Sequence, residues 1–347
     1  KTNCHLTVCM RLQSDFKGAI ARKDGLELTH CVFWNPDYKP ILFEHITTLP
    51  FSTKQQKDVS QTISFIDGGE QTLFVSSSYL LGLVRVAASV WTGIRRKKIV
   101  AKEFIVFVNV VEQQYNITFY TKNGEEIIPF EDELYSTLSF QRTDYDIEEA
   151  FNTVRRYLEL SFSRTQLHDT NMLVIDGSLR TFAPEEHKLI KQLQESAREK
   201  NVLVIGFQKT TSVHTNTKRS LAQLQTMFGT KEWMTSKLCE NTNNLHPAIL
   251  HALHLHPHSR HVFIIEVSEQ QELRQEHFNA LREQGKDPIF LGYPYGLIDA
   301  DSIARVSDEE VRYMQLEVRK LLGENAKQLE EDLSSKDAHG ILDSMKF

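Results

Sequence analysis

The hydrophobic positions of this chain gather in short runs that predict strands. Residues 63–66 and 172–175 are almost continuously apolar, as strands buried on both faces of a sheet are. Residues 104–111 and 115–120 are rich in β-branched and aromatic residues, which predicts two paired strands. Residues 78–91 are apolar at nearly every position, and this pattern predicts either a buried helix or a buried strand.

Helical spacing begins near residue 146, where Ile147, Phe151 and Val154 fall on or near one face of a helix that reaches residue 162. Pro184 is placed where the first turn of a second helix would begin. Residues 202–209 predict another buried strand. The remaining patterns predict a hairpin at residues 249–256 and 261–267, a helix from about Gly296, and a charged helix after Ser307.

The patterning divides the chain into three predicted parts. Residues 1–60 mix short apolar runs with turn signals, which predicts a β-rich or irregular extension. Residues 61–306 hold the strands and helices of an α/β domain, in which residues 210–260 are a candidate insertion. Residues 307–347 are rich in charge and predict an exposed helix and a tail.

The composition indicates an ordinary globular protein. Of 347 residues, 40% are hydrophobic and 25% are charged. No apolar stretch has the length of a membrane span and the first residues lack a signal-peptide core, so we expect a cytoplasmic protein with no membrane partner. The four cysteines show no C-x-x-C spacing, so neither a disulfide framework nor a zinc site is predicted.

The charge distribution limits how the chain could bind nucleic acid. A formal net charge of −6 argues against a protein that coats nucleic acid with its whole surface. A local basic channel stays open, because Arg95, Arg96, Lys97 and Lys98 are consecutive cations that could contact phosphate. The alternative is that this run is only a solvated loop or helix end.

Two carboxylates follow the two buried strands directly. Asp67 and Asp176 each end an apolar run and precede a glycine. A charged aspartate at the end of a buried strand costs stability unless a cation compensates it, so two such strands side by side would offer oxygen ligands to divalent metals. The alternative is that each Asp-Gly is simply a turn dipeptide.

A third carboxylate is expected from the helix that precedes the second of these strands. Glu159 qualifies, because it lies in an otherwise apolar part of that helix, although a solvated helix face is the alternative. Glu148 and Glu149 lie near the amino end, where acidic side chains favour the helix dipole, and are interpreted as structural. Oxygen-only ligands favour magnesium or manganese over zinc.

The order of strands and helices, with carboxylates at strand ends, predicts a ribonuclease-H-like α/β fold. This fold is a mixed sheet flanked by helices, here with a β-rich N-terminal extension and a helical C-terminal tail.

These motifs, taken in order, resemble those of the NurA nucleases of DNA end processing. The order and spacing of the motifs agree with those of the family from about residue 60 to 306. No single motif is specific by itself. The matching segments are residues 65–69 (FIDGG), the helix glutamate Glu159, residues 174–179 (VIDGSL), residues 204–211 (VIGFQKTT), a strand that ends in Glu266, and residues 292–301 (GYPYGLIDAD).

The resemblance implies a manganese-dependent (or magnesium-dependent) DNA nuclease that works as a homodimer. It also implies a hexameric HerA-type ATPase as partner, which would feed DNA ends to the nuclease in break repair or antiviral defence. Carried over residue by residue, Asp67, Glu159 and Asp176 would be metal ligands. The chain departs from the family at Asp301, where a histidine is common, and at Gly69, where a serine is more usual. Aspartate can also bind a metal, so Asp301 is kept as a candidate catalytic residue.

Two further residues are candidates for contacts with DNA. Lys209 ends a strand and could stabilise the pentavalent phosphate, or it could instead neutralise Asp176 in a salt bridge. Tyr293 could stack on a nucleotide, although a Tyr-Pro pair before a helix more often has a packing role.

A metal site is also suggested by a cluster of histidines at positions 246, 251, 254, 256, 258 and 261. However, His254 and His256 lie on one face of a predicted hairpin, which suits an exposed strand edge equally well.

The predicted function is metal-dependent phosphodiester hydrolysis of the two-metal type. One alternative is a NurA-like adaptor subunit that no longer cuts DNA, which the Asp301 departure favours and the three retained carboxylates oppose. Another is a different ribonuclease-H-like enzyme of the transposase or Argonaute kind, although such proteins usually carry further nucleic-acid-binding domains. A Rossmann enzyme is less consistent with the chain, because no G-x-G-x-x-G follows a strand.

Overall fold

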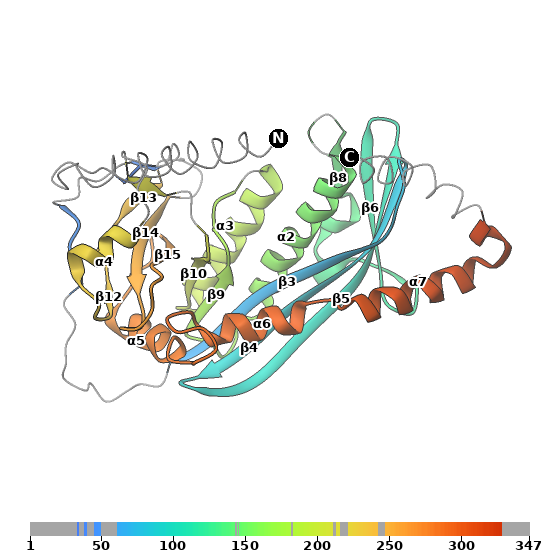
Figure 1. Ribbon diagram of the computed structural model, residues 1–347. Helices are drawn as coiled ribbons and strands as arrows, with labels where there is room; N and C mark the ends of the chain where they lie inside the picture. Colours follow the sequence, from blue (N-terminus) through green and yellow to red (C-terminus); the bar gives the residue numbers. More distant parts are fainter. Residues whose placement is uncertain are drawn as a thin grey trace, which may run out of the picture. The chain divides into compact units, whose positions relative to one another are not determined.

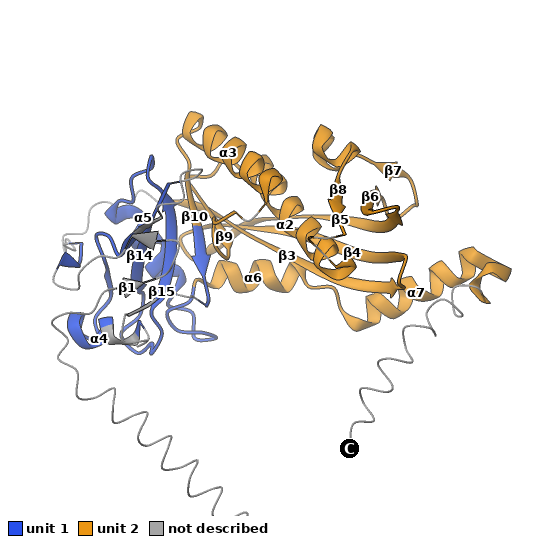
Figure 2. Ribbon diagram, turned by 90° about the horizontal axis from the view of Figure 1, so that it is seen from above, with its two compact units in different colours: residues 1–58, 206–293 blue, residues 59–205, 294–347 orange. Residues whose placement is uncertain are grey.

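The structure is a computed structural model, and two compact units divide the chain. Unit 1 comprises Lys1–Asp58 and Gly206–Tyr293, and unit 2 comprises Val59–Ile205 and Pro294–Phe347 (Figure 2). The structure describes residues 33–34, 38–39, 45–49, 61–142, 144, 146–181, 183–210, 213–215, 221–241 and 247–327.

Unit 2 is built on a mixed sheet (Figure 1). The order of hydrogen-bonded neighbours in this sheet is β9, β3, β4, β5, β6 and β7. Strand β8 also pairs with β6. Strand β9 runs parallel to β3, whereas β4, β5 and β6 are antiparallel to their neighbours. The strands are β3 (Thr62–Val75), β4 (Tyr79–Thr92), β5 (Arg95–Val111), β6 (Gln114–Tyr120), β7 (Glu126–Ile127), β8 (Ser139–Gln141), β9 (Met172–Asp176) and β10 (Leu203–Gln208), whose first three residues belong to this unit.

Helices cover both faces of the sheet in unit 2 (Figure 2). Helices α2 (Ile147–Thr165) and α3 (Pro184–Glu199) lie on one face, and α6 (Tyr295–Ala304) and α7 (Asp308–Leu322) lie on the other. A Cβ on Gly82 of β4 would overlap the ring of Phe151 in α2, and a Cβ on Gly296 of α6 would overlap the ring of Phe65 in β3. These two close approaches show how tightly each helix layer packs on the strands. The described part of this unit also contains three short 3₁₀ helices: η3 (Pro129–Glu131), η4 (Glu133–Ser136) and η5 (Gly323–Asn325).

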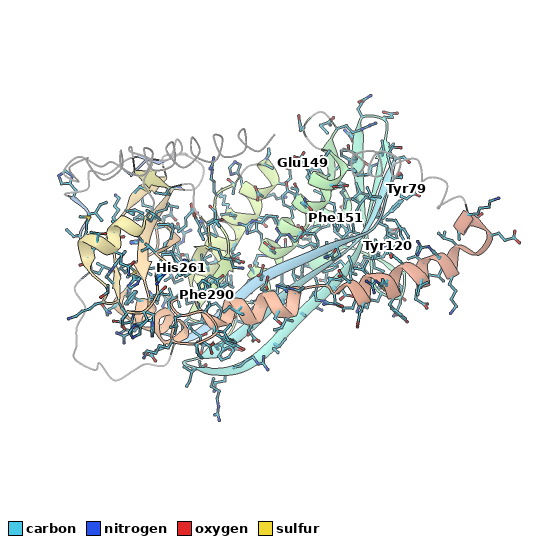
Figure 3. The ribbon with its side chains drawn as sticks, viewed as in Figure 1. Tyr79, Tyr120, Glu149, Phe151, His261 and Phe290 are labelled. Carbon is cyan, nitrogen blue, oxygen red and sulfur yellow. The ribbon has the colours of Figure 1, made fainter. Side chains whose placement is uncertain are left out.

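Helix α2 begins where its sequence predicts. The Glu149 N–H donates to Asp146 Oδ1 over 2.7 Å, and the Asp146 N–H donates to Glu149 Oε2 over 3.1 Å, which is a complete capping box. The structural interpretation of Glu149 is therefore confirmed. Phe151, labelled in Figure 3, is buried in the core between α2 and the sheet, together with Tyr157 and Phe162. Each such buried aromatic side chain contributes roughly 1.5–3 kcal/mol by removal from water.

Unit 1 has a smaller sheet and its own core. Strands β2, β13, β14 and β15 are neighbours in that order, the end of β10 follows β15, and β12 also pairs with β14. Leu224, Trp233, Leu250 and Ile264 are among its buried core residues. Its elements are β1 (Phe33–Trp34), β2 (Tyr38–Lys39), β11 (His214–Thr215), α4 (Ala222–Phe228), β12 (Trp233–Met234), β13 (Cys239–Asn241), β14 (Ala248–His254), β15 (Phe263–Ser268) and α5 (Gln275–Gln284), and β1 pairs with β11.

Two predicted pairs of strands are present in the structure. The paired strands at residues 104–120 and the hairpin at residues 249–267 are confirmed as β5–β6 and β14–β15. Residues 78–91, whose apolar pattern fits a helix or a strand, lie almost entirely in β4. The basic run at Arg95 is neither a loop nor a helix end, because it begins strand β5. Most of the predicted N-terminal extension lies outside the described residues, and the predicted boundaries at 60 and 306 stay predictions. None of the helices within the described ranges combines the length and hydropathy that a membrane span requires.

Candidate functional site

The register of β3 and β9 brings the two strand-end aspartates together. Ile66 lies opposite Ile175 in the parallel pair, so Asp67 and Asp176 are the next residues on neighbouring strands. Adjacent strands lie about 4.8 Å apart, and residues at equal register project from the same face. Asp67 is only 7% exposed, and Asp176 is half-buried. Two carboxylates from distant parts of the sequence thus meet at one place on the sheet of unit 2.

The two Asp-Gly dipeptides have different conformations. Strand β3 continues through Gly68 as far as Val75, so the turn alternative is wrong at Asp67. Strand β9 does end at Asp176, and Gly177 has a φ of +100°, a left-handed turn conformation that favours glycine. Asp67 is therefore held inside a long strand, whereas Asp176 borders a loop.

Gly68 is where the third carboxylate approaches the strand. The Gly68 N–H donates to Asp67 Oδ1 over 2.8 Å. A Cβ on Gly68 would lie 2.5 Å from Oε1 of Glu159, which projects from α2 and has a side chain only 3% exposed. Glu159 is therefore buried against the backbone that carries Asp67, and the alternative of a solvated helix face is wrong.

Two arginines of α2 neutralise Glu159. Arg155 forms an ion pair with Glu159 Oε1 and another with Glu70 Oε2, and it donates to the Gly68 carbonyl over 3.2 Å. Arg156 lies 3.4 Å from Glu159 Oε2, where the helical spacing of three residues places it. Each carboxylate oxygen of Glu159 therefore has an arginine beside it.

Arg156 also connects the helix to the second aspartate motif. It donates to the carbonyl of Ser178, two residues after Asp176, over 2.5 Å, and it lies 3.6 Å from Glu186 Oε1 of α3. The loop after β9 is therefore tied to α2 and to Glu159.

The charges in this cluster act strongly on one another. Attraction to Glu159 raises the pKa of Arg155 against the opposing effect of desolvation, and Glu70 and Asp67 raise it further. Burial raises the pKa of the Glu70 carboxyl above its ordinary value, the charge of Arg155 opposes that rise, and the negative charge of Glu159 adds to it. Arg155 is thus held, fully charged, in the field of three carboxylates.

The donor chemistry of this region fits a hard divalent cation. Asp67, Asp176 and Glu159 supply carboxylate oxygens, the ligands that magnesium and manganese prefer. In the described part of the chain, no three or more His, Cys, Asp or Glu side chains are grouped so that they could hold a metal ion. The carboxylates fit the metal by type, and in this structure both Glu159 oxygens face arginine.

Helix α6 carries two aspartates in different surroundings. The Asp301 side chain is 40% exposed and pairs over 2.8 Å with Arg305, the residue that directly follows the helix. Asp299 is 8% exposed and accepts a hydrogen bond from Ser89 Oγ over 2.5 Å. Sequence reasoning did not select Asp299. The helical period could have found it, since it falls three residues after Gly296, which packs against the sheet.

The basic run at the start of β5 is mostly exposed. Arg95, Lys97 and Lys98 are exposed, and Ile94 beside them is 77% exposed. Arg96 differs, because it pairs with Asp299 Oδ1 over 2.9 Å while its side chain remains 47% exposed. Three of the four predicted phosphate contacts are therefore open to solvent, and the fourth is anchored to α6.

Lys209 and Tyr293 belong to unit 1. Tyr293 is 5% exposed, and its ring packs edge-on against Phe207 and Phe290, with centroids 5.3 and 5.7 Å apart. Lys209 Nζ lies 5.7 Å from the centroid of the same ring. These contacts favour packing as the role of Tyr293 and leave its ring little surface on which a nucleotide could stack.

The histidines of unit 1 include one correction. His254 is fully buried, so the expectation of an exposed strand edge is wrong there. Its Nδ1 lies 2.9 Å from the Lys231 carbonyl, and its Nε2 lies 3.0 Å from the Ser259 carbonyl. His261, labelled with Phe290 in Figure 3, packs against that ring with centroids 5.1 Å apart. His246 lies outside the described residues.

Comparisons with known proteins bear on the fold. No family model matches the chain, and no curated protein matches it by sequence. Endonuclease V of Ciona intestinalis in complex with inosine-containing DNA is 10% identical, with a TM-score of 0.39 over 74% of this chain and 89% of that one. The NurA nuclease from Sulfolobus solfataricus is 12% identical, with a TM-score of 0.56 over 94% of this chain and 98% of that one. The predicted mixed α/β fold is therefore confirmed, and the chain has the fold of the NurA nuclease.

Proposed function

We propose that this protein is a metal-dependent nuclease that hydrolyses phosphodiester bonds in DNA. The observation that carries the proposal is the parallel register of β3 and β9, which makes Asp67 and Asp176 neighbours. Glu159 adds a third carboxylate against Gly68. The fold shared with a NurA nuclease gives these residues an enzymatic context.

In this proposal, Asp67, Asp176 and Glu159 hold Mn²⁺ or Mg²⁺. A bound divalent metal would lower the pKa of a water and offset negative charge on the leaving oxygen. Other groups of the protein hold these carboxylates in position. The Gly68 N–H orients the Asp67 carboxylate, and Arg156 ties the loop after Asp176 to α2. Asp301, with its 40% exposed side chain, and Lys209 stay candidates for further contacts with the phosphate or metal.

We further propose that the protein works as a homodimer with a hexameric HerA-type ATPase, in the cytoplasm, in DNA repair or antiviral defence. These expectations rest on the resemblance of the motifs to the NurA family and on the shared fold. The competing proposal is an inactive adaptor subunit, which the half-buried, arginine-paired Asp301 favours in place of the usual histidine.

The test of the proposed function is cleavage of end-labelled linear duplex and single-stranded DNA in Mn²⁺, Mg²⁺ or EDTA, with and without the HerA-type partner. We expect cutting in Mn²⁺, no cutting in EDTA, and recovery when metal is restored, because the carboxylates need the metal to activate water. If the protein cleaves no DNA with either metal while the partner is present, the adaptor proposal is favoured. If DNA is cleaved as fast in EDTA as in Mn²⁺, a metal-dependent mechanism is contradicted.

The exposed cations of β5 are expected to bind the DNA backbone. Lys97→Gln/Lys98→Gln should weaken duplex binding and reduce the slope of log affinity against log salt by about two, since each phosphate contact contributes roughly 0.9 to that slope. Titration of labelled duplex at several salt concentrations measures it. The matched control is Lys188→Gln/Lys191→Gln, which removes two exposed cations from α3. If both double variants lose the same affinity, β5 has no special part in binding.

A further inference from the structure

We propose that Arg155 is an internal counter-cation that competes with the divalent metal for Glu159, so that metal binding displaces its guanidinium. This inference rests on the proposed metal site. It adds that the site has two states, one closed around arginine and one open to metal.

The contacts of Arg155 make it the centre of the acidic cluster. From one turn before Glu159, its guanidinium reaches Glu159 Oε1 and Glu70 Oε2 and donates to the Gly68 carbonyl over 3.2 Å. A cation that contacts two carboxylates and a carbonyl oxygen takes the same kind of donors as a magnesium or manganese ion. Of these groups, Glu159 Oε1 is the one that the proposed metal site shares with Arg155.

The burial of Glu159 explains why a counter-cation is required. Its side chain is 3% exposed, and an unpaired carboxylate at that depth is strongly destabilising. In the absence of metal, the arginines supply the compensating charge. When a divalent ion binds, that compensation becomes redundant and the like charges repel one another.

Of the two arginines, Arg155 is the one that can leave. Its side chain is 29% exposed, so it has a route to water, whereas the Arg156 side chain is 16% exposed. Arg156 is also bonded to the Ser178 carbonyl and lies near Glu186, contacts that tie it to the loop after β9 and to α3. Displacement of Arg155 would free Glu159 Oε1 and leave the loop after Asp176 anchored.

The test compares Mn²⁺ binding by calorimetry and Mn²⁺-induced change in Tm for the full chain and for Arg155→Gln. We expect Arg155→Gln to have a lower Tm than wild type in EDTA, and to bind Mn²⁺ on the order of tenfold more tightly with a larger gain in Tm, as removal of a competitor predicts. Neither readout depends on DNA cleavage.

Arg164→Gln is the matched control. Arg164 lies on the same helix with a side chain 32% exposed, and it pairs with Asp132 over 3.2 Å. This variant should lose some stability but bind Mn²⁺ as wild type does. If Arg155→Gln fails to fold, Arg155→Lys is used, and its affinity for Mn²⁺ should exceed that of wild type because one ammonium cannot keep the forked contacts.

The outcomes separate this inference from the proposed function. If wild type binds Mn²⁺, Asp67→Asn abolishes binding, and the Arg155 variants bind no more tightly than wild type, the metal site stands and the competition is overturned. If neither wild type nor any Arg155 variant binds Mn²⁺, the proposed metal site fails and this inference fails with it.

Discussion

Asp67→Asn and Asp176→Asn are each expected to reduce Mn²⁺-dependent DNA cleavage by about 10³-fold or more. Each replaces a proposed carboxylate ligand of the metal with a neutral amide, and the loss of several kcal/mol of transition-state stabilisation corresponds to a rate effect of about that size. Asparagine keeps the shape of the side chain, and at position 67 its carbonyl oxygen can still accept from the Gly68 N–H, 2.8 Å away in the present structure. The measurement is the cleavage rate of end-labelled duplex, with Tm recorded for each variant.

Asp132→Asn is the control for these substitutions. The Asp132 side chain is 10% exposed and pairs with Arg164 in the same unit, so its burial resembles that of Asp67. This variant should lose stability while the folded protein cleaves DNA at the wild-type rate. Wild-type cleavage by Asp67→Asn and Asp176→Asn would show that catalysis lies elsewhere in the molecule.

Gly68→Ala is expected to lower cleavage by about 100-fold. The new methyl group would lie 2.5 Å from Glu159 Oε1 and 2.8 Å from its Cγ, so the glutamate has to move. Its contacts with Arg155 and Arg156 hold it in place, and we expect overpacking to reduce the free energy of unfolding by about 1–3 kcal/mol. The loss of rate should exceed what the fall in stability explains.

Gly82→Ala provides the comparison for that experiment. A Cβ there would overlap the ring of Phe151, which belongs to the core rather than to the acidic cluster. We expect a clear fall in the urea midpoint of unfolding, with the cleavage rate per folded molecule within about twofold of wild type. If the two alanine variants lose cleavage in equal proportion to their stability, the position of Glu159 has no special importance for the reaction.

Much of the fold could be predicted because its signals are local. Helix α2 follows from its apolar spacing and from the capping residues Asp146 and Glu149, whose bonds the structure contains. Strands β3 and β9 follow from continuous apolar runs. Residues 78–91 could not be assigned in advance, because a segment buried on all sides has no polar face to reveal its period.

The candidate site could be predicted only in part. Asp67, Asp176 and Glu159 were found because each carboxylate interrupts or ends an apolar segment. Asp299 was not selected, because the family motif directs attention to Asp301, whereas the helical period decides which aspartate packs on the sheet. A catalytic role for Asp301 stays a prediction. His254 was misplaced because an alternating strand pattern does not show whether another segment covers its polar face.

The sequence by itself determined the kinds of elements and the residue types that the candidate site offers. Both depend on short-range properties: the period of apolar residues, the geometry of caps, and the chemistry of each side chain. The tertiary structure alone decided that Ile66 lies opposite Ile175 and that Glu159 is buried against Gly68 with Arg155 beside it. Strand register and charge pairing depend on which distant segments pack together, and that choice minimises the energy of the whole core rather than of any one segment.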